Sequence, residues 1–306
     1  MRLALAISVL LFLLASGGAH AEVKGAPRHR LHFHSLTAFQ YNPLGVQTDL
    51  TLSYRYRLFR PTSRLFEDTY VGVGPVVRVN PAYARGGLGV ELQPLMVLCL
   101  RAQWEFRGYY RTFGMIQSFK GAYSEHHDDH RKDRQELERH YSTTGHQVNL
   151  QAILRAKVGP WAVVNDLLVS YFKMDVKEGD TVFYDALTDM LTPADGVTVT
   201  NNAHLFYITG EGLTVGLRYT VAHALYSEEA MGPGAAGDAV VTPTHRLGPM
   251  FVYEWGGRGE RFHKPTLAII LNWWLKHRYR TGQQVNRGIP WVAVAFFFTG
   301  DLWSSR

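Results

Sequence analysis

The sequence has very little cysteine and, beyond its first residues, no long apolar run. Cys99 is the only cysteine among 306 residues, so no disulfide within the chain can stabilise a folded domain. The most apolar later stretch, 267–275, is interrupted by Asn272 and soon followed by Lys276. A membrane-spanning helix needs about 20 consecutive apolar residues. The sequence therefore predicts neither a disulfide-stabilised fold nor a transmembrane helix.

Charge of one sign is not concentrated anywhere in the chain. The formal net charge is +6, and the 32 basic residues are spread along the sequence instead of forming a block. This distribution does not suggest nucleic-acid binding, and it leaves anionic surfaces or solutes as candidate partners. Long-period repeats, low-complexity segments and linkers are also missing, so we expect one domain after the N-terminal segment.

The N-terminal segment has the parts of a secretory signal peptide. Arg2 supplies a positive charge, residues 3–14 are apolar, and Ala19 and Ala21 place small residues where signal peptidase reads them. The alternative is a membrane-anchoring helix, but the apolar run is short for spanning a bilayer. We predict a signal peptide of residues 1–21, cleavage after Ala21, export of the chain, and a mature domain of residues 22–306.

The dominant pattern in the mature chain is alternation of apolar and polar residues. In 48–58, even positions are mostly apolar or aromatic, and odd positions include Asp49, Arg55 and Arg57. A helix would place Arg55 beside Leu52 and Leu58, so the strand period of two fits better. Twelve segments show this pattern: 31–41, 46–59, 69–79, 86–93, 96–110, 146–158, 161–173, 203–209, 212–224, 245–255, 265–277 and 290–303.

The connections between these segments differ in length between the two sides of the predicted barrel. If the first strand runs outward from the periplasm, connections after even-numbered strands are periplasmic and short. The three longest connections, 111–145, 174–202 and 225–244, then all fall on the extracellular side. Aromatic residues also gather near the expected strand ends: Trp161, Trp255 and Trp303 on one side, and Tyr109, Tyr110, Tyr171 and Trp291 on the other.

Over nearly its whole length the chain resembles bacterial outer-membrane β-barrel proteins, which combine an even strand number, short periplasmic turns, long outer loops and two aromatic girdles. The resemblance implies an all-β fold, a transmembrane antiparallel β-barrel of about twelve strands. A soluble sandwich or a lipocalin-like barrel shares the alternation and is the alternative. The export signal, the strand lengths, the loop sides and the aromatic ends favour the membrane barrel.

The C-terminal strand is similar to the signal that the barrel-assembly machinery reads. The residues that carry the likeness are Phe296, Phe298, Leu302 and Trp303. Three further residues, 304–306, follow the aromatic position, which departs from the usual pattern. The resemblance implies that the partners are outer-membrane lipids, lipopolysaccharide and the assembly machinery, with other envelope proteins as further candidates.

One predicted outer loop contains potential metal ligands: His126, His127, Asp128 and His130. Imidazole and carboxylate groups suit zinc, copper or nickel. Adjacent residues rarely all point at one ion, and a stable site needs ligands held in a fixed geometry. A solvated loop is therefore the favoured interpretation, and we predict no metal and no cofactor.

A possible catalytic pair lies where that loop ends. Outer-membrane phospholipases with twelve strands use a His-x-Ser pair and an asparagine that orients the histidine, and His140, Ser142 and Asn149 are similar to this set. Residues i and i+2 of a strand share a face, as a base and its hydroxyl require. The surrounding sequence departs from that family, so we expect a protein that is not an enzyme.

The charged residues on the polar strand faces are the most informative functional feature. In a membrane barrel they would line the lumen: Asp49, Arg55, Arg57, Glu91, Arg101, Glu105, Arg107, Arg155, Lys157, Arg218, Arg246, Glu254, Lys276 and Asp301. Either these charges neutralise one another in a packed network, or a positive wall lines a narrow channel that favours anions. The sequence favours a narrow passive pore for small solutes, with a leaning toward anions. A docking component of an envelope machine and a lipid hydrolase are the alternatives.

Overall fold

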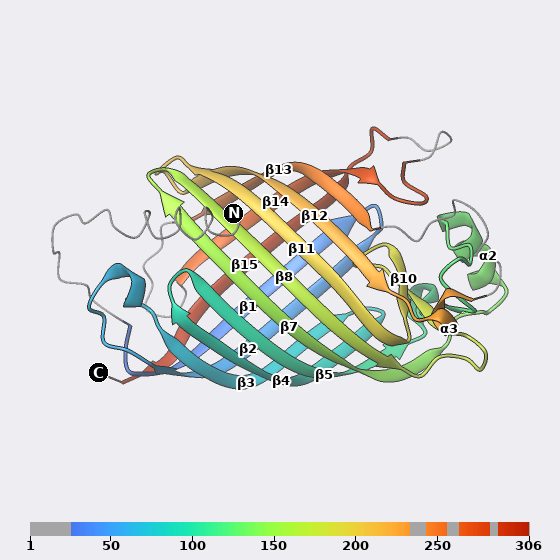
Figure 1. The fold of residues 1–306 in the computed structure, drawn as a ribbon, viewed down its shortest axis with the longest axis horizontal. Coiled ribbons are helices and arrows are strands. Elements are labelled where there is room, and N and C mark those ends of the chain that lie inside the picture. Colours follow the sequence, from blue (N-terminus) through green and yellow to red (C-terminus); the bar gives the residue numbers. More distant parts are fainter. Residues whose placement is uncertain (1–25, 233–242, 256–262, 282–286, 306) are drawn as a thin grey trace, which may run out of the picture.

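The computed structural model describes residues 26–232, 243–255, 263–281 and 287–305. Within these residues twelve strands form one closed antiparallel barrel, as predicted (Figure 1). The predicted signal peptide lies outside the described residues. The barrel strands are β1 (His29–Tyr41), β2 (Gly45–Arg57), β3 (Tyr70–Asn80), β4 (Tyr83–Leu95), β5 (Leu98–Tyr110), β7 (Ser142–Val158), β8 (Trp161–Met174), β11 (Asp195–Ile208), β12 (Leu213–Leu225), β13 (Thr244–Glu254), β14 (His263–Lys276) and β15 (Trp291–Ser304).

Each barrel strand pairs with its neighbours in chain order, and β1 closes the barrel by pairing with β15. Three strands, β4, β7 and β11, are longer than the alternation indicated by four residues or more. The segment predicted at 86–93 belongs to β4, and the one at 203–209 belongs to β11, so the predicted loop 174–202 was too long. In β11 the adjacent amides Asn201 and Asn202 resemble a turn and hide the alternation of the preceding residues.

The two faces of the barrel wall differ sharply. The outward face exposes large apolar side chains, including Leu50, Val73, Leu88, Trp104 and Leu150. Their sequence neighbours point into the lumen and are largely polar. In a closed barrel every strand finds a partner on both sides, which satisfies the backbone groups within a bilayer. Of the helices in the described residues, none has the length and apolar character needed to cross a membrane.

The aromatic residues at the strand ends divide between these faces. Trp161, Trp255 and Trp303 are exposed at the end of the barrel with the short turns, and Tyr110 and Tyr171 are exposed at the other end. The prediction that Tyr109 and Trp291 belong to the ring of aromatic residues around the outer end of the barrel is wrong. Both are buried on the lumen side, because strand parity places Tyr109 with Arg107 and Trp291 with Ala293.

The long connections gather at one end of the barrel, which we call the outer mouth (Figure 1). They contain a small second sheet that the sequence did not indicate, with strand order β10-β9-β6. Its strands are β6 (Ser118–Phe119), β9 (Val182–Asp185) and β10 (Met190–Pro193). Two helices, α2 (Asp128–Glu136) and α3 (Glu228–Met231), lie at the same end, and η2 (Thr112–Gly114) follows β5. At the opposite end, η1 (Arg64–Phe66) lies between β2 and β3.

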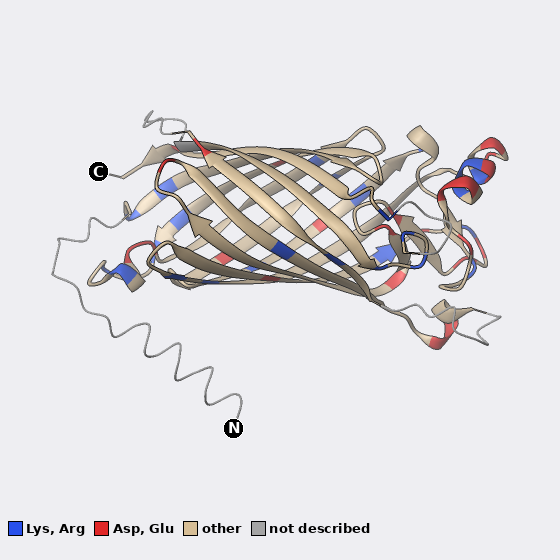
Figure 2. Cartoon of the chain, turned by 90° about the horizontal axis from the view of Figure 1, so that it is seen from above, with Lys and Arg blue, Asp and Glu red and all other residues tan. Residues whose placement is uncertain are grey.

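Charged residues are distributed differently over the barrel wall and the outer mouth. Figure 2 shows acidic and basic residues together on α2 and its surroundings, while much of the barrel wall is neutral. The small sheet itself is apolar inside, because Phe119, Val182, Tyr184 and Leu191 pack with Ala230 of α3. The outer mouth is therefore a folded structure with its own core and not a set of solvated loops.

Candidate functional site: the lumen and its outer mouth

The first charge cluster in the lumen centres on Glu91. Its carboxylate lies 2.8 Å from Arg55 Nη2 and 3.0 Å from Arg101 Nε, and all three side chains project from the inward faces of β2, β4 and β5. Tyr70 of β3 donates its hydroxyl to the same carboxylate at 3.3 Å. One acid thus offsets two arginines, and the cluster keeps a net positive charge.

The second cluster centres on Glu105, which is completely buried. Arg78 forms an ion pair with Glu105 and also lies 3.2 Å from Asp49 Oδ2. Arg85 Nη1 lies 3.6 Å from the other oxygen of Glu105, and Asn149 Nδ2 donates to Glu105 at 3.1 Å. These groups come from β2, β3, β4, β5 and β7, so this cluster ties five consecutive strands together.

Two members of this cluster were missed in the sequence. Arg78 alternates with Val77 and Val79 and was recognisable as an inward residue by that signal. Arg85 precedes the predicted segment 86–93, so only the longer strand seen in the structure places it in the wall.

The remaining predicted lumen residues lie nearer the ends of the barrel. Asp301 Oδ1 is 2.8 Å from His32 Nδ1, and Arg57 donates to the carbonyl of Ala26 at 2.8 Å. Arg155 and Lys157 lie near the periplasmic end of β7, where Lys157 is exposed. Glu254 ends β13, and Lys276 is exposed at the outer end of β14.

A different kind of site occurs on β12 and β13, in the wall opposite the Glu91 and Glu105 clusters. Within the described residues, neither Arg218 nor Arg246 has a carboxylate within ion-pair distance. Their guanidinium groups instead lie over indole rings, Arg246 at 4.3 Å and Arg218 at 5.8 Å from the Trp291 centroid. Arg107 resembles them, because its described partners are aromatic: Tyr83, Tyr109 and Phe172.

The small sheet crosses the outer mouth from one side of the barrel to the other. Phe183 of β9 packs with Phe172 of β8 and belongs to a core that includes Tyr83 and Tyr109. At the opposite side, Gln40 of β1 donates to the carbonyl of Ala186 at 3.0 Å. The β9–β10 hairpin, which includes Phe183 and Ala186, is thus held by barrel strands on both sides.

Asp189 fixes the far end of this hairpin. Its carboxylate accepts from Arg280 Nε at 2.7 Å and from the Tyr184 hydroxyl at 2.6 Å, and it lies 3.5 Å from His277 Nε2. Burial would raise the pKa of Asp189, but His277 and the hydrogen-bonded Arg280 outweigh it and lower that pKa. Burial also lowers the pKa of His277.

The potential metal ligands of the sequence, His126, His127, Asp128 and His130, make contacts with other groups in the structure. His127 Nδ1 accepts from the His130 backbone N–H at 3.0 Å and caps α2, while Asp128 pairs with Arg131 and Arg280. His126 packs edge-on against the ring of Tyr279. In the described part of the chain no group of three or more His, Cys, Asp or Glu side chains is placed to hold a metal ion.

The phospholipase-like residues do not form a catalytic set. Asn149 is buried in the lumen, where it contacts Glu105, Gln147 and Ser170. Ser142 is seven positions earlier on the same strand and is exposed. An odd separation places two strand residues on opposite faces, so Asn149 cannot orient a base beside Ser142.

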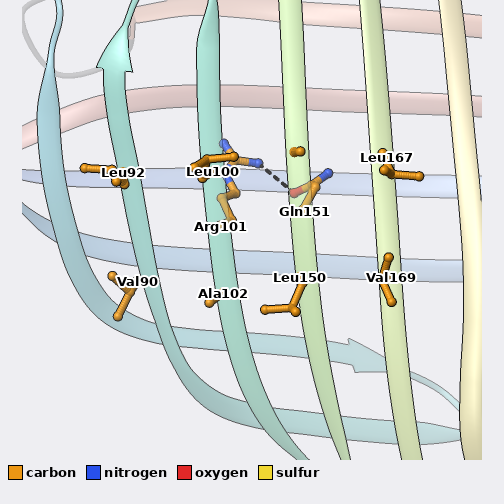
Figure 3. A pocket seen from close by; sticks show the side chains of 10 residues that line it. Val90, Leu92, Leu100, Arg101, Ala102, Leu150, Gln151, Leu167 and Val169 are labelled. Atoms are coloured by element: carbon orange, nitrogen blue, oxygen red, sulfur yellow. Dashed lines mark hydrogen bonds between the residues drawn. The ribbon is translucent and has the colours of Figure 1, made fainter.

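An apolar hollow lies on the outside of the wall, over β4, β5, β7 and β8 (Figure 3). Exposed side chains such as Val90, Leu100 and Leu150 surround the small Ala102 and Ala152. The Arg101–Gln151 hydrogen bond of 3.4 Å links side chains that belong to the inward face of this wall. The hollow is therefore a feature of the lipid-facing surface and not a solute site within the lumen.

The closed barrel, its apolar outer face and its polar lumen define a transmembrane β-barrel of the bacterial outer-membrane type. No protein-family model matches the chain, and no curated protein matches it by sequence.

Several solved structures are similar in architecture. A structure titled KdgM porin in complex with disordered oligogalacturonate is 8% identical, with 89% of this chain and 100% of that chain covered and a TM-score of 0.39. The translocator domain of the autotransporter NalP from Neisseria meningitidis is 11% identical, with coverage of 97% and 94% and a TM-score of 0.40. The CymD monoaromatic hydrocarbon channel is 10% identical, with coverage of 92% and 90% and a TM-score of 0.37.

Proposed function

We propose that the chain is an outer-membrane pore that conducts small solutes with a preference for anions. The observation that supports this proposal is the excess of lumen arginines over carboxylates. The clusters around Glu91 and Glu105 offset part of the positive charge, whereas Arg107, Arg218 and Arg246 have aromatic neighbours in place of acids. Fixed positive charge along a narrow lumen raises the local anion concentration and repels cations.

The small sheet gives this pore a closed outer mouth. Because it contacts strands on opposite sides of the barrel, passage requires the β9–β10 hairpin to move or leaves only a narrow route beside it. The alternative supported by the same feature is a plugged barrel that acts as a docking component of an envelope machine. The hydrolase alternative is not supported by the positions of Ser142 and Asn149.

The proposal places the chain in the outer membrane after removal of the predicted signal peptide. Its apolar face would contact outer-membrane lipids and lipopolysaccharide. The assembly machinery would read the last strand, in which Phe296, Leu302 and Trp303 are exposed and Phe298 lies 5.8 Å from Phe296 between ring centroids. Exposure of these side chains on β15 fits recognition before the barrel closes against β1.

Single-channel recording of the refolded protein in a planar bilayer tests the proposal. We expect discrete conductance steps that select for anions, and we expect Arg107→Gln to reduce the anion-to-cation permeability ratio by about twofold or more, since it removes a buried charge facing the lumen. Arg111→Gln is the matched control, because Arg111 is about half exposed and pairs with the exposed Glu138 outside the barrel. A folded protein without conductance would reject the pore and favour the docking role.

A further inference from the structure

The wall opposite the Glu91 and Glu105 clusters carries an ordered stack of alternating indole and guanidinium groups. Arg246 of β13 lies between two tryptophans, with its Cζ 4.8 Å from the Trp274 centroid and 4.3 Å from the Trp291 centroid. Arg218 of β12 lies on Trp291 at 5.8 Å. We call Arg218, Arg246, Asn272, Trp274 and Trp291 the Trp–Arg cluster.

Strand register explains why these side chains meet. Arg246 is directly opposite Trp274 in the β13–β14 pair, and Asn272 is directly opposite Trp291 in the β14–β15 pair. Asn272 and Trp274 are two positions apart, so both project inward from β14. Asn202 of β11 accepts from Arg218 Nη2 at 2.7 Å and orients that guanidinium group. The cluster is thus built on four rigid strands and not on loops.

The unusual property of the cluster is its surplus of hydrogen-bond donors. Arg246 Nη1, Trp274 Nε1, Trp291 Nε1 and Asn272 Nδ2 are all buried and have no acceptor among the described residues; Asn272 Oδ1 is the one acceptor in the same condition. The four side chains are each at most 8% exposed. Buried donors are nearly always satisfied in native proteins, so several together on one wall need an acceptor that the described residues do not supply.

The charge of the cluster indicates what kind of acceptor fits. Elsewhere in the lumen, Arg55, Arg78 and Arg101 each lie within ion-pair distance of Glu or Asp. In the described part of the Trp–Arg cluster, two arginines lie in one wall without such a partner. The acids whose charge acts on Arg218 and Arg246 are Asp166 and Asp189, and neither lies within ion-pair distance of its arginine. A neutral acceptor would satisfy the donors and leave both guanidinium groups without a direct ion pair, whereas an anion satisfies both requirements.

We propose that the Trp–Arg cluster binds a small oxyanion, a carboxylate or phosphate group, within the lumen. The planar guanidinium of Arg246, held between two indole rings, presents a preoriented donor of the kind that matches oxyanions, and the indole N–H groups add donors that cannot accept. The inference rests on the proposed anion-conducting function and deepens it, since it assigns a site in the lumen at which the permeating solute binds.

Indole N–H resonances in the ¹⁵N-tryptophan-labelled protein, refolded in detergent micelles, provide a direct test. The chain has 7 tryptophans, so Trp274 and Trp291 can be assigned by single Trp→Phe variants. At constant ionic strength we expect sodium acetate or sodium phosphate to shift these two resonances along one saturating curve. The resonance of Trp161, exposed on the lipid side, serves as the internal control.

Arg246→Gln should raise the anion concentration that half-saturates the two indole shifts at least tenfold. Arg155→Gln removes a charge elsewhere on the lumen face and should leave that concentration unchanged. Trp291→Phe keeps the aromatic ring and removes one donor, and it provides a second variant if Arg246→Gln does not fold. The titrant that saturates the shifts at the lower concentration, acetate or phosphate, identifies the preferred ligand as a carboxylate or a phosphate. A chloride titration that gives the same curve would indicate a general charge effect and overturn the oxyanion assignment.

Absence of a saturable shift at both indoles, or an equal shift in Arg246→Gln, would overturn the site. These outcomes are separable from those of the bilayer recording. A silent barrel that still shows the two-indole response would retain the oxyanion site and reject the pore. A conducting, anion-selective barrel without the response would retain the pore and reject the site.

Discussion

Glu105 shows how much one buried residue contributes to the order of the lumen. Its carboxylate contacts Arg78 and Arg85 and accepts from Asn149, and none of its surface is exposed. We expect Glu105→Gln to destabilise the barrel by about 3–5 kcal/mol, because removing one partner leaves buried charges without compensation. Urea unfolding in detergent micelles, followed by tryptophan fluorescence, measures the change.

The matched control is Asp195→Asn. Asp195 is an exposed carboxylate on β11 that accepts from the Tyr171 hydroxyl at 2.7 Å. A surface substitution of this kind should change the unfolding free energy by no more than about 0.5 kcal/mol. Equal effects of the two substitutions would contradict the role assigned to Glu105.

At the scale of the strand, adjacent glycines in β4 have different requirements. A Cβ at Gly87 would lie 1.8 Å from the Trp104 carbonyl oxygen of β5, whereas a Cβ at Gly86 would meet nothing within 4 Å. Gly87→Ala therefore forces the two strands apart, and we expect it to destabilise the barrel by about 1–3 kcal/mol, as other steric overpacking does.

Gly86→Ala should leave the fold intact, because Gly86 faces outward into open space. Heat-modifiable migration on a denaturing gel reports whether each variant folds, and urea unfolding gives the size of the effect. If Gly87→Ala were as stable as Gly86→Ala, the close approach of β4 and β5 would not be required for the barrel.

At the scale of the whole molecule, we expect closure of the outer mouth to depend on pH, because two of its buried side chains, His126 and His277, are histidines with lowered pKa values. Burial lowers the pKa of His126 to about 3, although its backbone hydrogen bond to Ser124 and the charge of Asp189 oppose this. The pKa of His277 is also lowered by burial. We expect opening of the mouth to expose both imidazoles to solvent, which would return their pKa values to the ordinary value of 6.5.

The open form therefore binds more protons than the closed form, and closure is lost progressively as the pH falls from about 6.5 toward 3. We expect the open probability in bilayer recordings to rise at least tenfold between about pH 7 and pH 4.5. His126→Phe keeps a ring against Tyr279 but does not titrate, so it should reduce the response. An open probability that does not change with pH would show that the histidines do not control the mouth.

The sequence determined the class of fold and the number of barrel strands. Alternation with a period of two is a local property, so the inward position of Glu91, Arg101 and Glu105 could be read from the chain alone. The same rule, applied strictly, would have placed Tyr109 in the lumen beside Arg107. It also separates Ser142 from Asn149 by an odd number of positions, which rules out their use as one catalytic set.

The tertiary structure decided which of the inward residues meet. The partners of Glu91 come from β2 and β5, and Arg246 meets Trp291 across β14, so these contacts depend on the register of several strands together. The sheet at the outer mouth joins Ser118 to Phe183, which are far apart in the chain, through strands too short to show alternation. A period shows which face a residue occupies, but only the closed barrel shows what lies opposite it.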